Sequence, residues 1–188
     1  MIIALTGTPG TGKTTVCGFI AEHSQYRKQY RIIDLNKLVI DEKLYTEKDE
    51  ERNSYNADLE KLEERVKLVI SQAPADVDII MESHLSHYLP ADAIVVLRAN
   101  PVALRKRLGK RKEYSFEKVK ENANAEALDV ILVESVEMSK NVFEINTTDV
   151  TPLAVVKSVI SIIGSLKNGK TPEDFLPGKI NWIELMEL

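Results

Sequence analysis

The chain has 188 residues, 44% of them apolar and 29% charged, with a formal net charge of −4. This composition fits one soluble α/β domain and excludes two full domains, unless the second is an insertion. No apolar run is long enough to cross a bilayer, which argues against a membrane protein. The negative charge argues against indiscriminate nucleic-acid binding, because such binding depends on many Lys and Arg contacts to phosphate.

The single cysteine, Cys17, allows no internal disulfide, and the apolar run that begins at residue 2 leaves no room for a signal peptide. We therefore expect a cytoplasmic protein, with Cys17 as a small buried core residue. We also expect a monomer.

The first motif is a glycine-rich stretch directly after the apolar residues 2–5. Residues 7–14 read Gly-Thr-Pro-Gly-Thr-Gly-Lys-Thr and fit the P-loop pattern G-x-x-x-x-G-K-[ST]. The apolar run before the motif and the amphipathic run after it predict strand, loop and helix. The glycines let backbone N–H groups turn toward a polyphosphate, and the helix N-terminus adds its positive dipole end. Lys13 is then predicted to reach the β and γ phosphates of ATP, and the Thr14 hydroxyl to hold Mg²⁺.

After the first helix, residues 30–35 predict a second short strand, with Asp34 at its carboxyl end. In open α/β sheets, ligands collect at that end of the strands. The segment 35–56 has weak periodicity and many charges, so we expect a mobile arm with a short helix rather than core. From Ala57 the apolar residues recur at helical spacing, which predicts a helix that stops near Pro74.

Two continuous apolar runs, 77–81 and 93–97, predict central parallel strands that are buried on both faces. A fifth strand is predicted at 142–145, and the tail 167–188 is expected to dock onto the body. Five strands that alternate with helices predict a three-layer α/β fold, a parallel sheet with helices on both faces. The later helices are predicted to begin at Asn100-Pro101, at Ser115, from which the helix runs to about Met138, and at Thr151-Pro152.

Lys and Arg residues gather around the helix that follows Pro101. Arg107 and Arg111 are four residues apart, so one helix is predicted to present both guanidinium groups on one face. Kinases of small acceptors need such cations near the transferred phosphoryl group. A solvated basic face is the alternative. The cluster consists of Arg98, Arg105, Lys106, Arg107, Lys110, Arg111 and Lys112.

Several short sequence strings together resemble an archaeal-type member of the adenylate kinase isoenzyme 6 family. The resemblance covers Met1 to about Ile163. It implies a P-loop fold of the nucleoside monophosphate kinase type with a very short lid. Members of that family act as adenylate kinases and as ATPases in small ribosomal subunit maturation. The strings are Leu5-Thr6-Gly7-Thr8-Pro9-Gly10, Glu82-Ser83-His84, Val96-Leu97-Arg98 and Arg107-Leu108-Gly109-Lys110-Arg111, with Asn122 and Glu126.

The length predicts a single domain over 1–188, and the resemblance makes it a kinase domain with a monophosphate-binding arm at 31–54 and a short lid at 110–120. It places Asp34 and Lys37 at the substrate entrance of the arm. A short lid excludes water poorly, which gives a physical reason for mixed kinase and ATPase activity. The ATP phosphate site is assigned to Gly10, Thr11, Gly12, Lys13, Thr14, Thr15 and Arg111, with Arg107 beside it.

The sequence departs from the family pattern at two positions. Glu82 stands where the family usually has Asp, and a Glu can still hold Mg²⁺ through its water shell together with Thr14. Lys37 stands where the family usually has Arg, so a point charge replaces a bidentate fork. Both changes bear on the metal and on monophosphate selectivity.

Two further features of the sequence each allow two interpretations. His84 either orients the attacking water or contacts the γ-phosphate, as its match in the family implies, or it simply forms hydrogen bonds at the strand end. The stretch 146–148 either lies beside the adenine base or is a plain turn.

The sequence therefore predicts an adenylate kinase, ATP + AMP = 2 ADP, with Mg²⁺ and intrinsic ATPase activity. The alternative is an ATPase assembly factor for the small ribosomal subunit that binds a ribosomal protein or rRNA. A kinase of another small metabolite is a third possibility. The predicted catalytic residues are Lys13, Glu82, His84, Arg107 and Arg111.

Overall fold

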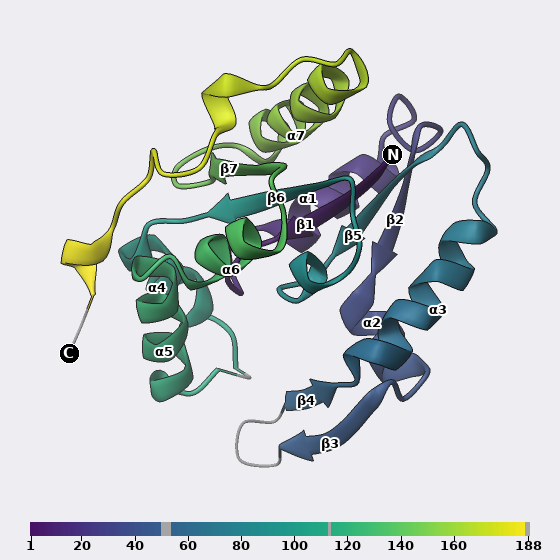
Figure 1. Ribbon diagram of the computed structural model, residues 1–188. Helices are drawn as coiled ribbons and strands as arrows, with labels where there is room; N and C mark the ends of the chain where they lie inside the picture. The colour runs from purple at the N-terminus through teal and green to yellow at the C-terminus, as the bar shows by residue number, and fades with distance from the viewer. Residues whose placement is uncertain (50–53, 113, 187–188) are drawn as a thin grey trace.

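The computed structural model describes residues 1–49, 54–112 and 114–186. In this part of the chain, five parallel strands form one sheet in the order β2-β5-β1-β6-β7 (Figure 1). A two-stranded antiparallel hairpin, β3-β4, stands apart from it. The strands are β1 (Ile2–Thr6), β2 (Tyr30–Asp34), β3 (Tyr45–Asp49), β4 (Ser54–Ala57), β5 (Asp78–Glu82), β6 (Ala93–Arg98) and β7 (Val142–Asn146).

Helices cover both faces of the sheet, which confirms the predicted three layers. Successive strand residues point to opposite faces, so Ile3 and Leu5 join the core under α1 and α7, whereas Ala4 joins the core under α2, α3 and α6. Cys17 is buried in the first of these cores, as predicted. The helices are α1 (Lys13–Glu22), α2 (Leu35–Asp41), α3 (Leu59–Ser71), α4 (Pro101–Leu108), α5 (Phe116–Ala127), α6 (Val130–Met138) and α7 (Pro152–Lys167), with short 3-10 turns η1 (Ser86–Tyr88), η2 (Glu173–Phe175) and η3 (Ile183–Leu185).

The segment expected to be an arm outside the core is partly core. Its first helix, α2, buries Leu35 and Val39 against the sheet, so the prediction is wrong there. The sequence does not reveal this burial, because a helix of only seven residues among many charged neighbours carries just these two buried apolar residues, four positions apart. The hairpin β3-β4 follows, and residues 50–53 of the predicted arm 31–54 lie outside the described residues.

The single helix predicted from Ser115 to Met138 is two helices, so this prediction is also wrong. The break lies at Asp129, which has a φ of +57° in the left-handed region. Its carboxylate accepts a hydrogen bond from Arg98 Nη2, and this tertiary contact fixes the break. Ser115 caps α5 as predicted, and its hydroxyl accepts from the Lys118 N–H at 3.2 Å.

The tail leaves α7, passes β7 and ends beside α4 and α5 (Figure 1). The N–H groups of Lys179 and Ile180 donate to the Glu144 carboxylate on β7. A guanidinium N–H of Arg105 on α4 donates to the Leu185 carbonyl at 3.2 Å. The predicted docking of the tail is therefore confirmed for the residues described, and residues 187–188 lie outside them. Among the described helices, none is both long and apolar enough to cross a membrane.

Candidate active site

The P-loop connects β1 to α1 and depends on glycines in the left-handed region. Gly7, Gly10 and Gly12 have φ values of +131°, +90° and +104°. A Cβ on Gly7 would lie 2.2 Å from the Leu97 carbonyl oxygen, so this position also needs the absence of a side chain. The loop therefore has the predicted conformation, with the N-terminus of α1 directly behind it.

Lys13 lies inside the P-loop and is only 7% exposed. Its ammonium donates to the carbonyl oxygens of Gly7 at 2.6 Å and Thr8 at 3.2 Å. Burial lowers the pKa of Lys13 to about 8, against the attraction of Glu82 and Glu126, which raises it. The side chain is thus a mostly protonated cation at neutral pH, held where an anion can reach it.

An oxygen-rich group lies at the carboxyl ends of β2 and β5. The Thr14 hydroxyl donates to the Glu82 carboxylate at 3.1 Å, and Asp34 pairs with Glu82 in the sheet register. Burial raises the pKa of Glu82, and Asp34 raises it further, while Lys13 and Thr14 lower it. Hydroxyl and carboxylate oxygens are the ligands Mg²⁺ prefers, so these residues fit that ion.

Mg²⁺ bound with a nucleotide keeps several waters and needs few protein ligands. The described residues contain no group of three or more His, Cys, Asp and Glu that could hold a metal by themselves. The pair Thr14 and Glu82 therefore matches a metal site that the protein shares with a bound nucleotide better than a site made of protein ligands alone.

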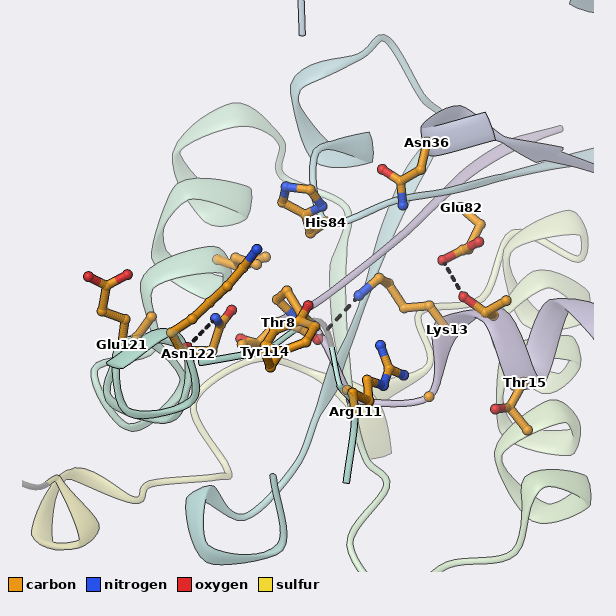
Figure 2. Close-up of a pocket in the computed structure, with 17 residues that line it drawn as sticks. Thr8, Lys13, Thr15, Asn36, Glu82, His84, Arg111, Tyr114, Glu121 and Asn122 are labelled. Atoms are coloured by element: carbon orange, nitrogen blue, oxygen red, sulfur yellow. Dashed lines mark hydrogen bonds between the residues drawn. The ribbon is translucent and has the colours of Figure 1, made fainter. Parts of the chain in front are cut away.

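Two cavities meet at the carboxyl edge of the sheet, and Figure 2 shows the one over the P-loop. The loop cavity, about 490 Å³, lies over the P-loop and is bounded by Lys13 and Arg111. The α2 cavity, about 480 Å³, lies between α2 and β4 and is lined by Val39 and Tyr55. Both cavities are lined by Asn36 and His84. A molecule in one cavity can therefore meet a molecule in the other at these two side chains.

His84 follows β5 and its ring is open to both cavities. His84 is exposed at the cavity mouth, yet partial loss of hydration lowers its pKa to about 4, and the positive charges of Lys13 and Lys118 act in the same direction. Its imidazole is therefore neutral at pH 7. A neutral ring with so low a pKa is a weak base, which favours hydrogen bonding and orientation over proton abstraction.

Arg107 and Arg111 do not lie on one helix, because α4 ends at Leu108. The prediction that one helix presents both is wrong. The Arg107 guanidinium donates to the Thr147 carbonyl at 2.9 Å and to the Gly10 carbonyl at 3.3 Å. Both arginines nevertheless line a third cavity of about 250 Å³, the Thr147 cavity, and Arg111 also reaches the loop cavity. Thr11 and Thr15 line this third cavity as well.

The two residues predicted at the substrate entrance, Asp34 and Lys37, lie at the N-terminus of α2. The Asp34 carboxylate accepts from the Lys37 N–H at 2.9 Å and caps the helix, while the Lys37 side chain is exposed. The neighbouring Asn36 lines both cavities, and its side-chain oxygen accepts from the Ser83 hydroxyl at 3.0 Å. Sequence reasoning assigned Asn36 no role of its own beside Asp34 and Lys37, although its place in the first turn after a strand end was a usable signal.

The lid side of the loop cavity also holds Tyr114 and Lys118, which the sequence did not single out. The Tyr114 ring lies 5.9 Å from Arg111 Cζ and 5.0 Å from Lys118 Nζ, so two cations contact one aromatic ring. Tyr114, Lys118 and Asn122 all line the cavity. Asn122 fits the family pattern noted above. Residue 113 of the predicted lid 110–120 lies outside the described residues.

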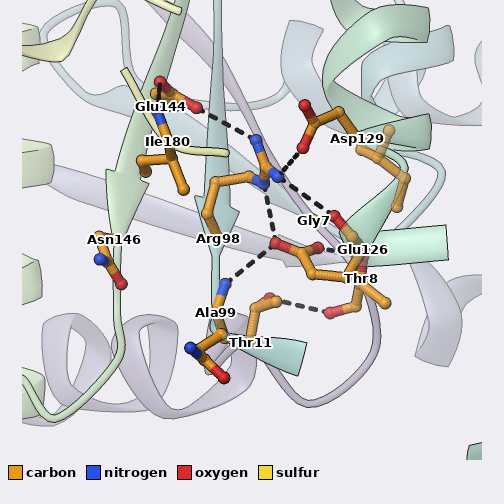
Figure 3. A network of polar contacts seen from close by, with 12 residues as sticks. Gly7, Thr8, Thr11, Arg98, Ala99, Glu126, Asp129, Glu144, Asn146 and Ile180 are labelled. Carbon is orange, nitrogen blue, oxygen red and sulfur yellow. Dashed lines mark hydrogen bonds and ion pairs between the residues drawn. The ribbon is translucent and has the colours of Figure 1, made fainter. Parts of the chain in front are cut away.

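Arg98 does not belong to the exposed basic cluster, which corrects that prediction. It is 1% exposed and lies behind the P-loop among three carboxylates (Figure 3). Its guanidinium donates to Glu126 at 2.8 Å, to Glu144 at 3.1 Å and to Asp129. A formal charge in the sequence does not reveal burial, and only these distant partners allow it.

The comparisons agree with this geometry. A family model described as an AAA domain matches residues 3–129. The chain is 47% identical to a "Putative adenylate kinase" of Methanosarcina acetivorans over 98% of both chains. It is 44% identical to a protein of the same name in Methanosarcina barkeri, over 99% of this chain and 100% of that one.

A solved shikimate kinase from Bacteroides thetaiotaomicron has the same fold, with a TM-score of 0.58 and 17% identity. That likeness covers 87% of this chain and 98% of the kinase. Fold and site define a P-loop α/β protein of the nucleoside monophosphate kinase type. The chain belongs to the AAA domain family and to the family of these archaeal relatives.

Proposed function

We propose that the protein is an adenylate kinase that catalyses ATP + AMP = 2 ADP with Mg²⁺. The observation that carries the proposal is the meeting of the loop cavity and the α2 cavity at Asn36 and His84. A phosphoryl transfer needs the donor phosphate and the acceptor phosphate side by side and in line. The name of the archaeal relatives agrees with this reaction.

In this proposal the triphosphate lies over the P-loop and the monophosphate lies in the α2 cavity. Lys13 and Arg111, which both line the loop cavity, stabilise the charge of the transferred phosphoryl group. Thr14 and Glu82 hold Mg²⁺, which neutralises phosphate charge when it is bound. The base of ATP occupies the Thr147 cavity, where the planar guanidinium of Arg107 offers a stacking surface.

His84 orients the acceptor in this proposal. Its neutral imidazole can donate one hydrogen bond and accept another between the two cavities. A base with a pKa of about 4 contributes little to proton abstraction at pH 7. The metaphosphate-like transition state of phosphoryl transfer does not require a strong base. Asp34 and Lys37 shape the acceptor side of the site, because they fix the first turn of α2.

Intrinsic ATPase activity is a second proposal, and one observation favours it. α4 ends at Leu108 and α5 begins at Phe116, so the connection that would close over the phosphates is short. A small lid leaves a route by which water can take the place of the acceptor. The ribosome assembly role, with a ribosomal protein or rRNA as partner, stays a prediction because it rests on the resemblance alone. The monomeric state and the cytoplasmic location also stay predictions.

The test is to measure ADP formation from ATP with AMP, CMP, UMP or GMP, alongside phosphate release from ATP alone. We expect fast ADP formation that requires AMP, and slow phosphate release without an acceptor. His84→Ala should slow transfer to AMP strongly, whereas His84→Gln should retain more activity because an amide can replace both hydrogen bonds.

The matched control is His23→Ala, since His23 is an exposed histidine at the end of α1. It should leave both rates unchanged. Phosphate release that no acceptor accelerates would refute the kinase and leave the ATPase. Equal rates with all four monophosphates would refute the assignment of AMP as the acceptor.

A further inference from the structure

The carboxylate of Glu126 joins the P-loop to the strand behind it (Figure 3). One oxygen accepts from the Thr8 hydroxyl at 2.5 Å, and the other accepts from the Ala99 N–H at 3.0 Å and from Arg98 Nε at 2.8 Å. Glu126, Thr8 and Arg98 are each at most 2% exposed. Because these groups are closely packed and bonded to one another, the carboxylate cannot shift without displacing Thr8 or Arg98.

Arg98 alone does not balance the charge around it. Its guanidinium faces the carboxylates of Glu126, Asp129 and Glu144, and Glu126 and Glu144 are 2% and 4% exposed. Buried carboxylates are costly unless hydrogen-bond donors reach their remaining lone pairs. The donors for Glu144 come from another part of the chain.

The tail supplies those donors. The N–H of Lys179 donates to the second oxygen of Glu144 at 2.7 Å, and the N–H of Ile180 donates to the same oxygen at 3.2 Å. The Trp182 ring lies 5.3 Å from Arg98 Cζ, a cation–π distance. Residues 179–182 therefore complete the coordination of the arginine that holds Glu126.

We infer that Glu126 is a positioning residue for the P-loop, and that tail residues 179–182 hold it in place through Glu144 and Arg98. The inference rests on the proposed function, because it concerns binding of ATP at this loop. Thr8 lines the loop cavity, so a P-loop already fixed at Thr8 loses less conformational freedom when a triphosphate binds. Tail docking and ATP binding then favour each other, and linkage makes the coupling equal in both directions.

The first experiment measures the Kd for ATP by calorimetry. A chain that ends at Gly178 should bind ATP about tenfold more weakly, and Glu144→Gln about fivefold, within the usual range of coupling between sites. The KM for AMP should not change, because the α2 cavity lies on α2 and β4, away from this network. Glu184→Gln makes the same chemical change on an exposed tail carboxylate and should leave the Kd for ATP unchanged.

Two variants test the P-loop end of the network. Thr8→Val removes the hydroxyl that donates to Glu126 and should weaken ATP binding. Thr8→Ser keeps the hydroxyl and should restore most of the affinity. This pair remains informative even if the shortened chain does not fold, since neither substitution changes the tail.

The reciprocal experiment follows the tail while ATP binds. Saturating ATP should slow hydrogen exchange of the Lys179 and Ile180 amides about tenfold, by the same coupling. The Phe175 amide, which bonds within the tail to Pro172, should exchange at an unchanged rate. Trp182 is the only tryptophan of the chain, so its fluorescence reports the same event.

The outcomes separate the two proposals. If the complete chain does not bind ATP, the proposed function is refuted, and this inference with it. If the complete chain binds ATP and the folded variants have the same Kd, this inference alone is refuted. A lower melting temperature with an unchanged Kd would also overturn it, because that result describes a merely structural network.

Discussion

Replacing Arg98 by Met tests whether this arginine is a buried charge or part of a surface cluster. Met fills a similar volume but leaves the carboxylates of Glu126 and Glu144 buried without their cation. Removing one partner of a buried ion pair costs about 3–5 kcal/mol. For a domain of this length, the melting temperature should fall by about 6–20 °C.

The assays are thermal melting and urea denaturation, both followed by circular dichroism at two pH values. Burial already raises the pKa of Glu126, and loss of Arg98 raises it further because Arg98 lowers it. A carboxyl whose folded pKa is raised binds more protons in the folded state, so the variant regains stability as the pH falls through that pKa. The deficit should therefore be smaller at about pH 5.5 than at about pH 7.

Lys106→Met is the matched control, because Lys106 is an exposed member of the basic cluster. Exposed substitutions of this kind change stability by about 0.5 kcal/mol or less. If Arg98→Met costs no more than Lys106→Met, or if its deficit grows as the pH falls, the account of the buried network is wrong.

The remaining predictions concern the P-loop and α2. Since the pKa of Lys13 is lowered to about 8, the affinity for ATP should fall about tenfold from pH 7 to pH 9, as a binding titration at several pH values can measure. In Lys13→Arg this pH dependence should disappear, because a guanidinium stays charged. Leu35→Ala should lower the free energy of unfolding by about 2–5 kcal/mol in urea denaturation, since Leu35 is fully buried under the sheet.

Each of these two predictions, for Lys13 and for Leu35, would be contradicted by a specific result. An affinity for ATP that is constant from pH 7 to pH 9 would contradict the lowered pKa of Lys13. For α2, the control is Ile40→Ala, since Ile40 is 50% exposed on the same helix. Equal losses from Leu35→Ala and Ile40→Ala would mean that α2 is not packed in the core.

The sequence by itself determined the sheet and the P-loop. Each of the five sheet strands was predicted, three of them as continuous apolar runs, and the order of glycines before Lys13 predicted the backbone that the structure has. Helix starts at Asn100, Ser115 and Thr151 followed from cap residues. All these signals are local, because a strand, a cap or a turn is decided by residues within a few positions of one another.

Only the tertiary structure decided which distant side chains meet. Arg98 is buried because Glu126 and Glu144, 28 and 46 residues away, fold around it, and Asp129 breaks a helix to reach it. Asn36 lies beside His84 because β2 and β5 are neighbours in the sheet. A charged residue has the same letter on a surface and in a core, and pairing across the sheet depends on loop closure that no local pattern encodes.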